Sequence, residues 1–235
     1  MLAETELDRE SRGTMRIECV VNGPIQTNTY FAISGDEAVV IDPASEGERL
    51  ARDFIDGHPG VRIVAIACTH GHADHVGGVA GMRRVLGEDV PFLMSEADIP
   101  IVPGAIRHLR GFYGLDTEEP PAPDRSLAEG DTLEFGDVEL QVLDAPGHTP
   151  GGIVLFAATE EGDLAFTGDT LFPGGHGRTD LEGGDDATIM RTLARLFTVL
   201  PEDTLCLIGH NGTTTVAQEL CANPFVREAL RAHAS

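Results

Sequence analysis

In its first third, the chain carries the run Thr69-His70-Gly71-His72-Ala73-Asp74-His75. Three imidazoles and one carboxylate thus occur within six positions, and these donors suit zinc, iron and manganese. In an extended segment, residues two positions apart point to the same side, so the two rings of the His-x-His pair can face one ion. Asp74 and His75 then turn into the element that follows. The run therefore predicts a metal site.

The surroundings of this run also indicate a site. Residues 61–68 form an apolar stretch typical of a buried strand, and residues 76–86 have the spacing of a helix. The run lies between the two, and open α/β sheets bind their ligands where a strand passes into a helix.

Three more potential ligands follow later apolar stretches. His148, Asp169 and His210 each stand in a turn after a predicted strand. Taken alone, each has an ordinary alternative, as a turn histidine, a helix-capping aspartate or a loop histidine. The repeated order of buried strand, turn and polar donor favours ligands. Together with the first run there are seven candidates, enough for two metal sites: His70, His72, Asp74, His75, His148, Asp169 and His210.

The rest of the pattern predicts one α/β domain. Two β-rich halves with helices outside them indicate a four-layer αββα sandwich. The predicted strands are 16–21, 29–33, 38–41, 61–68, 138–143, 153–157, 164–167 and 204–208. The predicted helices are 46–56, 76–86, 187–200 and 224–232.

Two segments stand apart from this pattern. Residues 1–14 are acidic and polar, which predicts a flexible leader ahead of a domain at 15–235, with Met15 as an alternative start. Residues 98–126 are rich in proline and glycine, and we expect an excursion of the chain near the site.

The charge and the cysteine content of the chain limit the kinds of partner and compartment that we expect for it. The chain has 39 acidic and 16 basic residues, a net charge of −23, and every basic residue is an arginine. Scattered arginines give no basic stripe for a polyanion, so we expect a small-molecule substrate and no nucleic acid. The four cysteines lack C-x-x-C spacing, and no apolar stretch suits a signal peptide or a membrane span. The sequence predicts a cytoplasmic protein without a membrane partner, and it leaves the oligomeric state open.

In order and context, the seven candidate ligands resemble those of the metallo-β-lactamase-fold superfamily, whose signature is His-x-His-x-Asp-His. The resemblance covers nearly the whole chain from Met15 onward. Four further stretches resemble the glyoxalase II-like thioesterase branch: Gln26-Thr27-Asn28-Thr29-Tyr30, Gly168-Asp169-Thr170-Leu171-Phe172, Gly177-Arg178-Thr179-Asp180-Leu181-Glu182-Gly183-Gly184-Asp185, and Thr213-Thr214 with Glu219 and Asn223-Pro224-Phe225.

The resemblance implies how the ligands are shared between two divalent ions. It places His70, His72 and His148 on the first ion, and Asp74, His75 and His210 on the second, with Asp169 bridging them. Zinc is favoured, with iron or manganese as alternatives. In such a centre a metal-bridging hydroxide attacks the acyl carbon, so Asp74 and Asp169 are the catalytic candidates.

The implied reaction is hydrolysis of a small acyl substrate, favouring a thioester of a low-molecular-weight thiol. The resemblance departs at two places. After His210 this chain has Asn211-Gly212-Thr213, and it ends at Ser235 without the helical C-terminal domain that larger glyoxalase II proteins use to hold glutathione. It therefore resembles a short form, and the thiol carrier stays open.

The sequence indicates the residues that contact the substrate less clearly than it indicates the metal ligands. Arg178 can bind a substrate carboxylate, although an ion pair with Asp180 or Glu182 is an equal alternative. Phe112 and Tyr113 are candidates to cover an apolar part of the substrate, or else they anchor their loop.

Three other functions stay open at this stage. An iron-dependent persulfide dioxygenase of the same fold uses mainly His70, His148 and Asp169. A lactonase or β-lactamase attacks a cyclic acyl group with the same hydroxide. A non-catalytic metal-binding protein is the third, and it is disfavoured because all seven ligand positions are filled.

Overall fold

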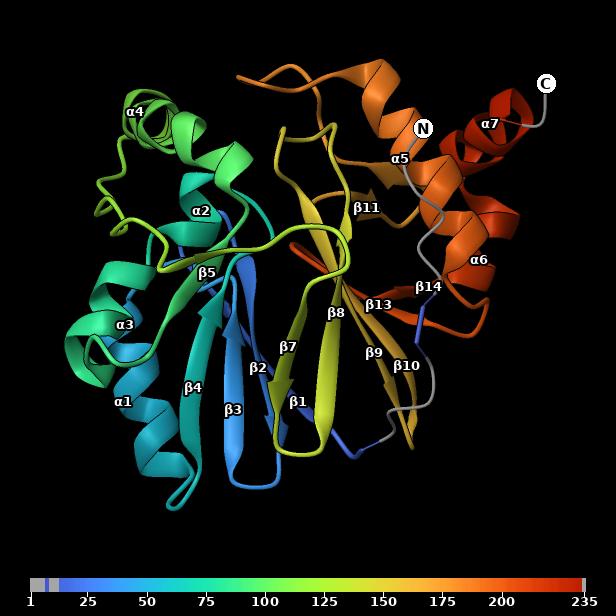
Figure 1. The fold of residues 1–235 in the computed structure, drawn as a ribbon. Coiled ribbons are helices and arrows are strands. Elements are labelled where there is room, and N and C mark those ends of the chain that lie inside the picture. Colours follow the sequence, from blue (N-terminus) through green and yellow to red (C-terminus); the bar gives the residue numbers. More distant parts are fainter. Residues whose placement is uncertain (1–6, 9–12, 234–235) are drawn as a thin grey trace.

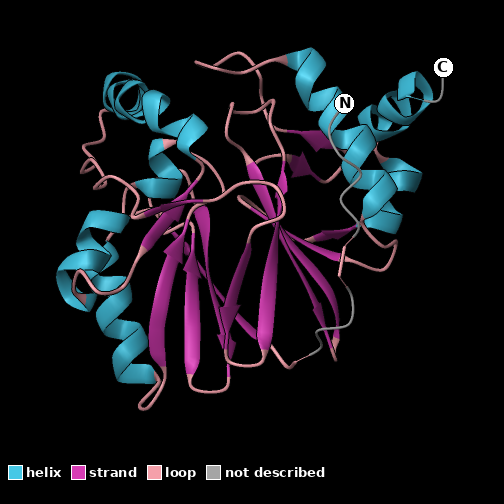
Figure 2. Ribbon diagram, in the orientation of Figure 1, coloured by secondary structure: helices cyan, strands magenta, loops and turns pink. Residues whose placement is uncertain are grey.

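The computed structural model describes residues 7–8 and 13–233 and has four layers. Two six-stranded sheets face each other, and helices cover both outer faces (Figures 1 and 2). The predicted four-layer αββα sandwich is confirmed. Most of the predicted leader, 1–14, lies outside the described residues.

The first sheet has the strand order β1-β2-β3-β4-β5-β6. Its strands β1, β2 and β3 form an antiparallel meander, and β4, β5 and β6 continue the sheet in parallel. Their bounds are β1 Arg16–Asn22, β2 Thr27–Ser34, β3 Glu37–Ile41, β4 Arg62–Ala67, β5 Phe92–Met94 and β6 Arg125–Ser126.

The second sheet has the order β14-β13-β10-β9-β8-β7. Strands β7 to β10 are antiparallel neighbours, whereas β13 lies parallel to β10. Their bounds are β7 Thr132–Phe135, β8 Val138–Asp144, β9 Ile153–Thr159, β10 Gly162–Gly168, β13 Leu205–Ile208 and β14 Thr214–Thr215. A separate small ribbon pairs β11 (Leu171–Phe172) with β12 (Gly175–His176).

The helices belong to one outer layer or the other (Figure 1). The first layer contains α1 Gly47–Gly57, α2 Ala73–Val76, α3 Val79–Leu86, the 3₁₀ helix η1 Glu96–Ile101 and α4 Val102–Tyr113. The second contains α5 Asp186–Val199, α6 Val216–Ala222 and α7 Pro224–His233. No described helix is long and apolar enough to cross a bilayer.

Alternate residues of a strand point to opposite faces of its sheet, so each strand contributes to two hydrophobic cores. On β9, Leu155 belongs to the core between the sheets, whereas its neighbours Val154 and Phe156 belong to the core under the helices of the second layer. Tyr30 and Phe166 join the sheets edge to face, with ring centroids 5.5 Å apart. Strands such as β9 are therefore buried on both faces. Side chains that bind a ligand must then lie in the loops at the ends of these strands.

The structure corrects two predictions about secondary structure. The helix predicted at 76–86 is two helices, α2 and α3, separated by Gly77 and Gly78. The segment predicted as an excursion is helical as far as Tyr113, because Pro103 occupies the first turn, where no N–H is needed, and Ile106 and Leu109 are buried. This helix, α4, stands above the site.

Candidate metal centre

All seven candidate ligands lie at one edge of the two sheets. That edge collects the loops after β4, β8, β10 and β13, because these strands end there (Figure 1). The loop after β4 and the short helix α2 supply the His-x-His-x-Asp-His run, and the other loops supply one ligand each. In chain order the residues are His70, His72, Asp74, His75, His148, Asp169 and His210.

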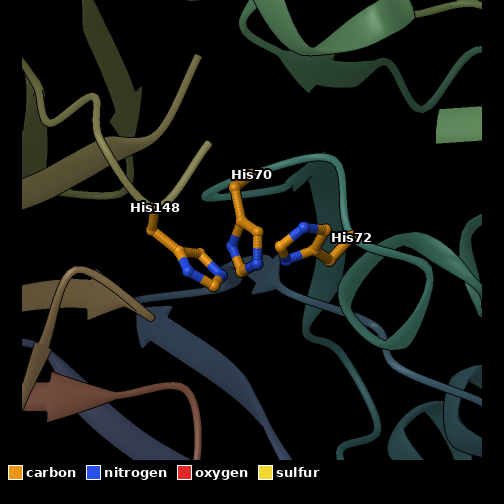
Figure 3. Close-up of side chains that lie close together, drawn as sticks. All are labelled: His70, His72 and His148. Carbon is orange, nitrogen blue, oxygen red and sulfur yellow. The ribbon is translucent and has the colours of Figure 1, made fainter. Parts of the chain in front are cut away.

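The donor atoms form two groups of three. The ligand atoms of His70, His72 and His148 lie within 4.8 Å of one another, and Figure 3 shows the three rings turned toward a common point. The ligand atoms of a second group, Asp74, His75 and His210, lie equally close together.

Asp169 lies between the two groups. Its Oδ2 is 3.7 Å from Nε2 of His148, in the first group, and 3.4 Å from Nε2 of His210, in the second. It also shares a cluster with His70 and His75. Asp169 can therefore contact a cation at either group, as a bridging ligand would.

The chemistry of the donors fits divalent cations. Nε2 of His70 and Nε2 of His148 are buried and have no hydrogen-bond partner. A buried polar atom left unsatisfied costs about 1–3 kcal/mol, and a cation at the common point would remove that cost. Imidazole nitrogens with carboxylate oxygens are a donor set for zinc, iron or manganese. The residues fit the two ions that the superfamily signature implies.

Two ligands of the first group, His70 and His72, are neutral near pH 7. Burial lowers the pKa of His70 well below its ordinary value, and it lowers the pKa of His72 to about 3. Both rings therefore keep a nitrogen lone pair free near neutral pH, which is the form that binds metals.

The second group lies in a negative field. Burial opposes charge on His75, yet Asp169, Asp42 and Asp74 together raise its pKa well above the ordinary value. Burial likewise opposes charge on His210, but hydrogen bonds to Asp169 and Asp74 raise its pKa to about 9. These carboxylates attract positive charge to this side of the centre, and a divalent cation can supply it.

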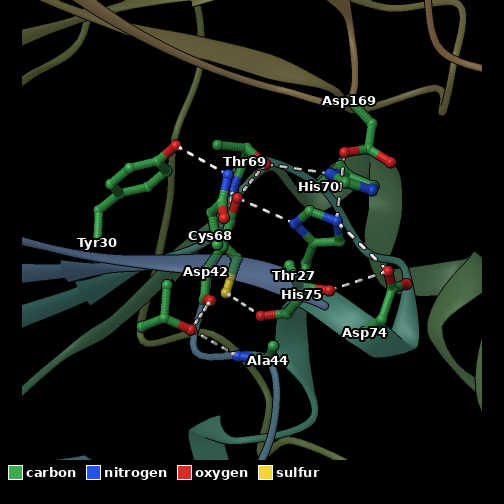
Figure 4. A network of polar contacts seen from close by, with 12 residues as sticks. Thr27, Tyr30, Asp42, Ala44, Cys68, Thr69, His70, Asp74, His75 and Asp169 are labelled. Atoms are coloured by element: carbon green, nitrogen blue, oxygen red, sulfur yellow. Dashed lines mark hydrogen bonds and ion pairs between the residues drawn. The ribbon is translucent and has the colours of Figure 1, made fainter. Parts of the chain in front are cut away.

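A residue absent from the sequence prediction, Asp42, orients the second group. It follows β3 with a positive φ of 53° and is buried. Its carboxylate accepts hydrogen bonds from the backbone N–H of Thr69 at 2.7 Å and from Nδ1 of His75 at 3.0 Å (Figure 4). The bond at Nδ1 leaves Nε2 of His75 to face the centre. Like the other site residues, Asp42 comes directly after a buried strand, and that signal could have found it.

Replacing Asp42 with asparagine should weaken the centre without removing a ligand. Asparagine tolerates the positive φ, but its amide group offers one acceptor oxygen in place of two. We expect metal affinity or activity to fall by about 10- to 100-fold, as for other residues that orient a metal ligand. Titration of chelator-treated protein with zinc measures the affinity, and an affinity equal to that of the unsubstituted protein would contradict the role given to Asp42.

Further hydrogen bonds fix the ligand loops relative to one another. The buried Asp98 accepts from the backbone N–H of Gly71 at 2.7 Å and of Gly151 at 2.5 Å, and so ties the loop of the His-x-His pair to the loop of His148. Nδ1 of His148 donates to the carbonyl of Arg178 at 2.7 Å, which turns its other ring nitrogen toward the centre.

The motif at residues 26–30 supports the loop of His210. Nδ2 of Asn28 donates to the carbonyls of Ile208 at 2.9 Å and Asn211 at 3.1 Å, and Oη of Tyr30 donates to the same Ile208 carbonyl at 2.7 Å. The first sheet thereby holds the end of β13 in the second sheet. Oγ1 of Thr27 donates to Oδ2 of Asp74 at 3.3 Å.

A pocket of about 550 Å³ opens above the two groups. Ligands from both groups form its floor, among them His72, Asp74 and His210. Helix α4 and the 178–182 loop supply its walls. This volume suits a small organic ligand, because such sites measure roughly 300–1,000 Å³.

Comparison with known proteins agrees with this architecture. Residues 22–210 match the family model described as the metallo-beta-lactamase superfamily. The chain belongs to this superfamily. The match spans β2 through the last candidate ligand, His210.

Individual relatives in the superfamily cover almost the whole chain. A probable metallo-hydrolase, YqgX of Bacillus subtilis, is 36% identical over 87% of this chain and 94% of its own length. The hydroxyacylglutathione hydrolase GloC of Haemophilus influenzae is 32% identical over 90% of this chain and 98% of its own length. The solved structure of TTHA1623 in a di-iron-bound form is 39% identical, covers 88% of this chain and 99% of that chain, and gives a TM-score of 0.77.

The three candidate substrate contacts have different surroundings. Arg178 lines the pocket, but its Nε and Nη2 donate to Asp180 at 2.7 and 2.8 Å. Tyr113 lines the pocket as well. Phe112 is not among the lining residues; it is 77% exposed and stacks on His108 with ring centroids 5.5 Å apart.

Proposed function

We propose that this metallo-hydrolase is a thioesterase that cleaves a small acyl group from a low-molecular-weight thiol. The observation that carries the proposal is the floor of the pocket, where two groups of metal-binding side chains and Asp169 meet under a space of about 550 Å³. Similarity to a protein named hydroxyacylglutathione hydrolase supports the choice of a thioester. We propose zinc as the metal, with iron as the alternative that the di-iron form of TTHA1623 suggests.

When bound, two divalent cations would lower the pKa of a water molecule to near neutral and polarise the acyl carbonyl. His70, His72 and His148 would hold one ion, and Asp74, His75 and His210 the other. Asp169 would contact both. These ligands lie at a pocket that is also lined by the apolar side chains of Ile25 and Phe172. An acyl chain can pack against these side chains.

Asp74 and Asp169, the two pocket carboxylates among the metal-binding side chains, are assigned to orient the attacking water. Burial would raise the pKa of Asp74, but His75 and His210 lower it to about 2, so the carboxylate is ionised at neutral pH. Oδ2 of Asp74 is 3.3 Å from Nε2 of His210 and 20% of the side chain is exposed, so it can accept a hydrogen bond from water. A thiol has a pKa of about 8.5, so the leaving thiolate needs no strong general acid.

We also propose a reduced, cytoplasmic setting and a small-molecule partner. All four cysteines are free, at Cys19, Cys68, Cys206 and Cys221. Low-molecular-weight thiols stay reduced in such a compartment. The net charge of −23 supports a small substrate over a nucleic acid.

A substrate panel with metal analysis tests the proposed function. Protein loaded with zinc, iron or manganese is assayed on acyl thioesters, lactones and β-lactams, and its metal content is measured. We expect two ions per chain and a kcat/KM for the best thioester about 100-fold above that for any lactone or β-lactam, since the thiolate leaves more easily. Chelator-treated protein is the control. One iron per chain with oxygen consumption on a persulfide would overturn the proposal in favour of the dioxygenase.

A further inference from the structure

One wall of the pocket is formed by helix α4. Ile106 and Leu109 bury one side of this helix in the core of the first layer. The same helix also lines the pocket, through Gly104, Ala105, Arg107, His108, Leu109 and Tyr113. The helix therefore presents apolar and polar side chains, Arg107 among them, to whatever occupies the space above the metal ligands.

Arg107 differs from the neighbouring arginines because its guanidinium forms no ion pair or hydrogen bond with a residue that the structure describes. Among these residues, no carboxylate lies within ion-pair distance of its guanidinium, and no acceptor lies within hydrogen-bond distance. By contrast, Nε of Arg110, one turn along the same helix, is 2.5 Å from Oδ1 of Asp116. Arg178, in the 178–182 loop, is paired with Asp180. In a chain with a net charge of −23, an exposed cation that lines a pocket and forms no ion pair with a described residue is a group available to a ligand.

The side chains of Arg107 and Glu182 come close to each other over Gly104. A methyl group placed on Gly104 would stand 3.7 Å from Nη2 of Arg107 and would collide with Oε2 of Glu182. Both charged groups thus lie over a position that has no side chain, within the lining of the same pocket. The carboxylate of Glu182 occupies the position that a side chain at residue 104 would fill, so a substrate anion must reach the guanidinium from the pocket, and Glu182 is the charge that would oppose it.

We propose that Arg107 is a specificity-determining residue that binds a carboxylate on the thiol portion of the substrate. This inference rests on the proposed thioesterase function. The small acyl group occupies the floor beside the metal ligands, so the thiol carrier must fill the space toward α4. A guanidinium presents two parallel N–H donors that match a carboxylate. The carrier is therefore an acidic thiol rather than a neutral one.

Matched substrates test this assignment. S-acetyl ω-mercaptoalkanoates with two to six methylene groups are compared with their methyl esters, in which the scissile bond is the same and the charge is gone. For the best chain length, we expect Arg107→Ala to lower kcat/KM for the acid by about 10- to 100-fold, through KM, and to change that for the ester less than about 2-fold. Arg110→Ala, on the same helix and outside the pocket, should leave both values unchanged.

A second variant moves the preference in the opposite direction. Glu182→Gln removes the opposing carboxylate, so the ratio of kcat/KM for the acid to that for the ester should rise by about 2- to 5-fold. A ratio that is the same in the unsubstituted protein, Arg107→Ala and Glu182→Gln would overturn the assignment while leaving the thioesterase function intact.

Binding of uncleavable analogues separates the two proposals. In these, a methylene group replaces the thioester sulfur, and calorimetry on the metal-loaded protein measures the Kd of each acid and its methyl ester. Tighter binding of the acid that is lost in Arg107→Ala supports the carboxylate site even if no thioester is cleaved, in which case only the thioesterase proposal fails. Equal binding of acid and ester to the unsubstituted protein would overturn the carboxylate site.

Discussion

Replacing Asp169 with alanine should lower kcat/KM for the best substrate by about 1,000-fold or more, the largest effect expected of any single substitution. Among the carboxylates that the structure describes, Asp169 reaches both groups of metal-binding side chains, through contacts to His148 and His210. Its pKa is held well below the ordinary value, because His75 and His210 outweigh the effect of burial. Removing it would take away a carboxylate that both groups of ligands share, so the content of both ions should fall.

Steady-state kinetics and metal analysis of the purified variant check this result together. Asp203→Ala is a matched control, because Asp203 is an exposed aspartate just before β13 and outside the pocket. It should keep the activity and the metal content of the unsubstituted protein. An Asp169→Ala variant that held two ions and more than a tenth of the activity would show that Asp169 does not bridge the groups.

The sequence was most informative where strand ends determine the chemistry. His148, Asp169 and His210 lie far apart in the chain, yet each follows a strand that is recognisable from its apolar run. Since strands β8, β10 and β13 belong to one sheet and end at the same edge, the fold brings the three side chains together. A strand pattern plus a donor at each strand end was enough to predict the cluster.

Helix α4 shows why the walls of the pocket were harder to predict. Its proline and glycines have low helix propensity, which favoured an irregular segment over 98–126. Burial of Ile106 and Leu109 in the core of the first layer outweighs that propensity, and such tertiary packing is not visible in a local pattern. The same limit hid Arg107, since the role proposed for it depends on the absence of an ion-pair partner among the described residues.

The residues that orient the ligands were also missed. Asp98 hydrogen-bonds to two backbone N–H groups that lie far from it and from each other in the sequence. Nothing in its local context, a serine and acidic residues ahead of a proline, distinguishes it from a surface carboxylate. Contacts with backbone atoms leave no residue-type pattern, so only the three-dimensional structure reveals them.

Replacing His75 with alanine should remove one ion and leave the other, which tests the division of the ligands into two groups. His75 lies wholly buried in the second group with Asp74 and His210, whereas the first group consists of His70, His72 and His148. We expect the metal content to fall from two ions per chain to about one, and kcat/KM to fall by about 100- to 1,000-fold. Asp42 would also lose its partner at Nδ1, so the free energy of unfolding should drop by about 1–3 kcal/mol.

His72→Ala is the reciprocal variant, because His72 belongs only to the first group. It should also retain about one ion, but on the other group of ligands. Cobalt substitution distinguishes the two retained sites, because three imidazoles and a mixed imidazole–carboxylate set give different absorption spectra. Identical spectra for the two variants, or loss of both ions in each, would mean that the seven side chains act as one undivided site. Different spectra with one ion each would assign the first ion to the loops after β4 and β8, and the second to α2 and the end of β13.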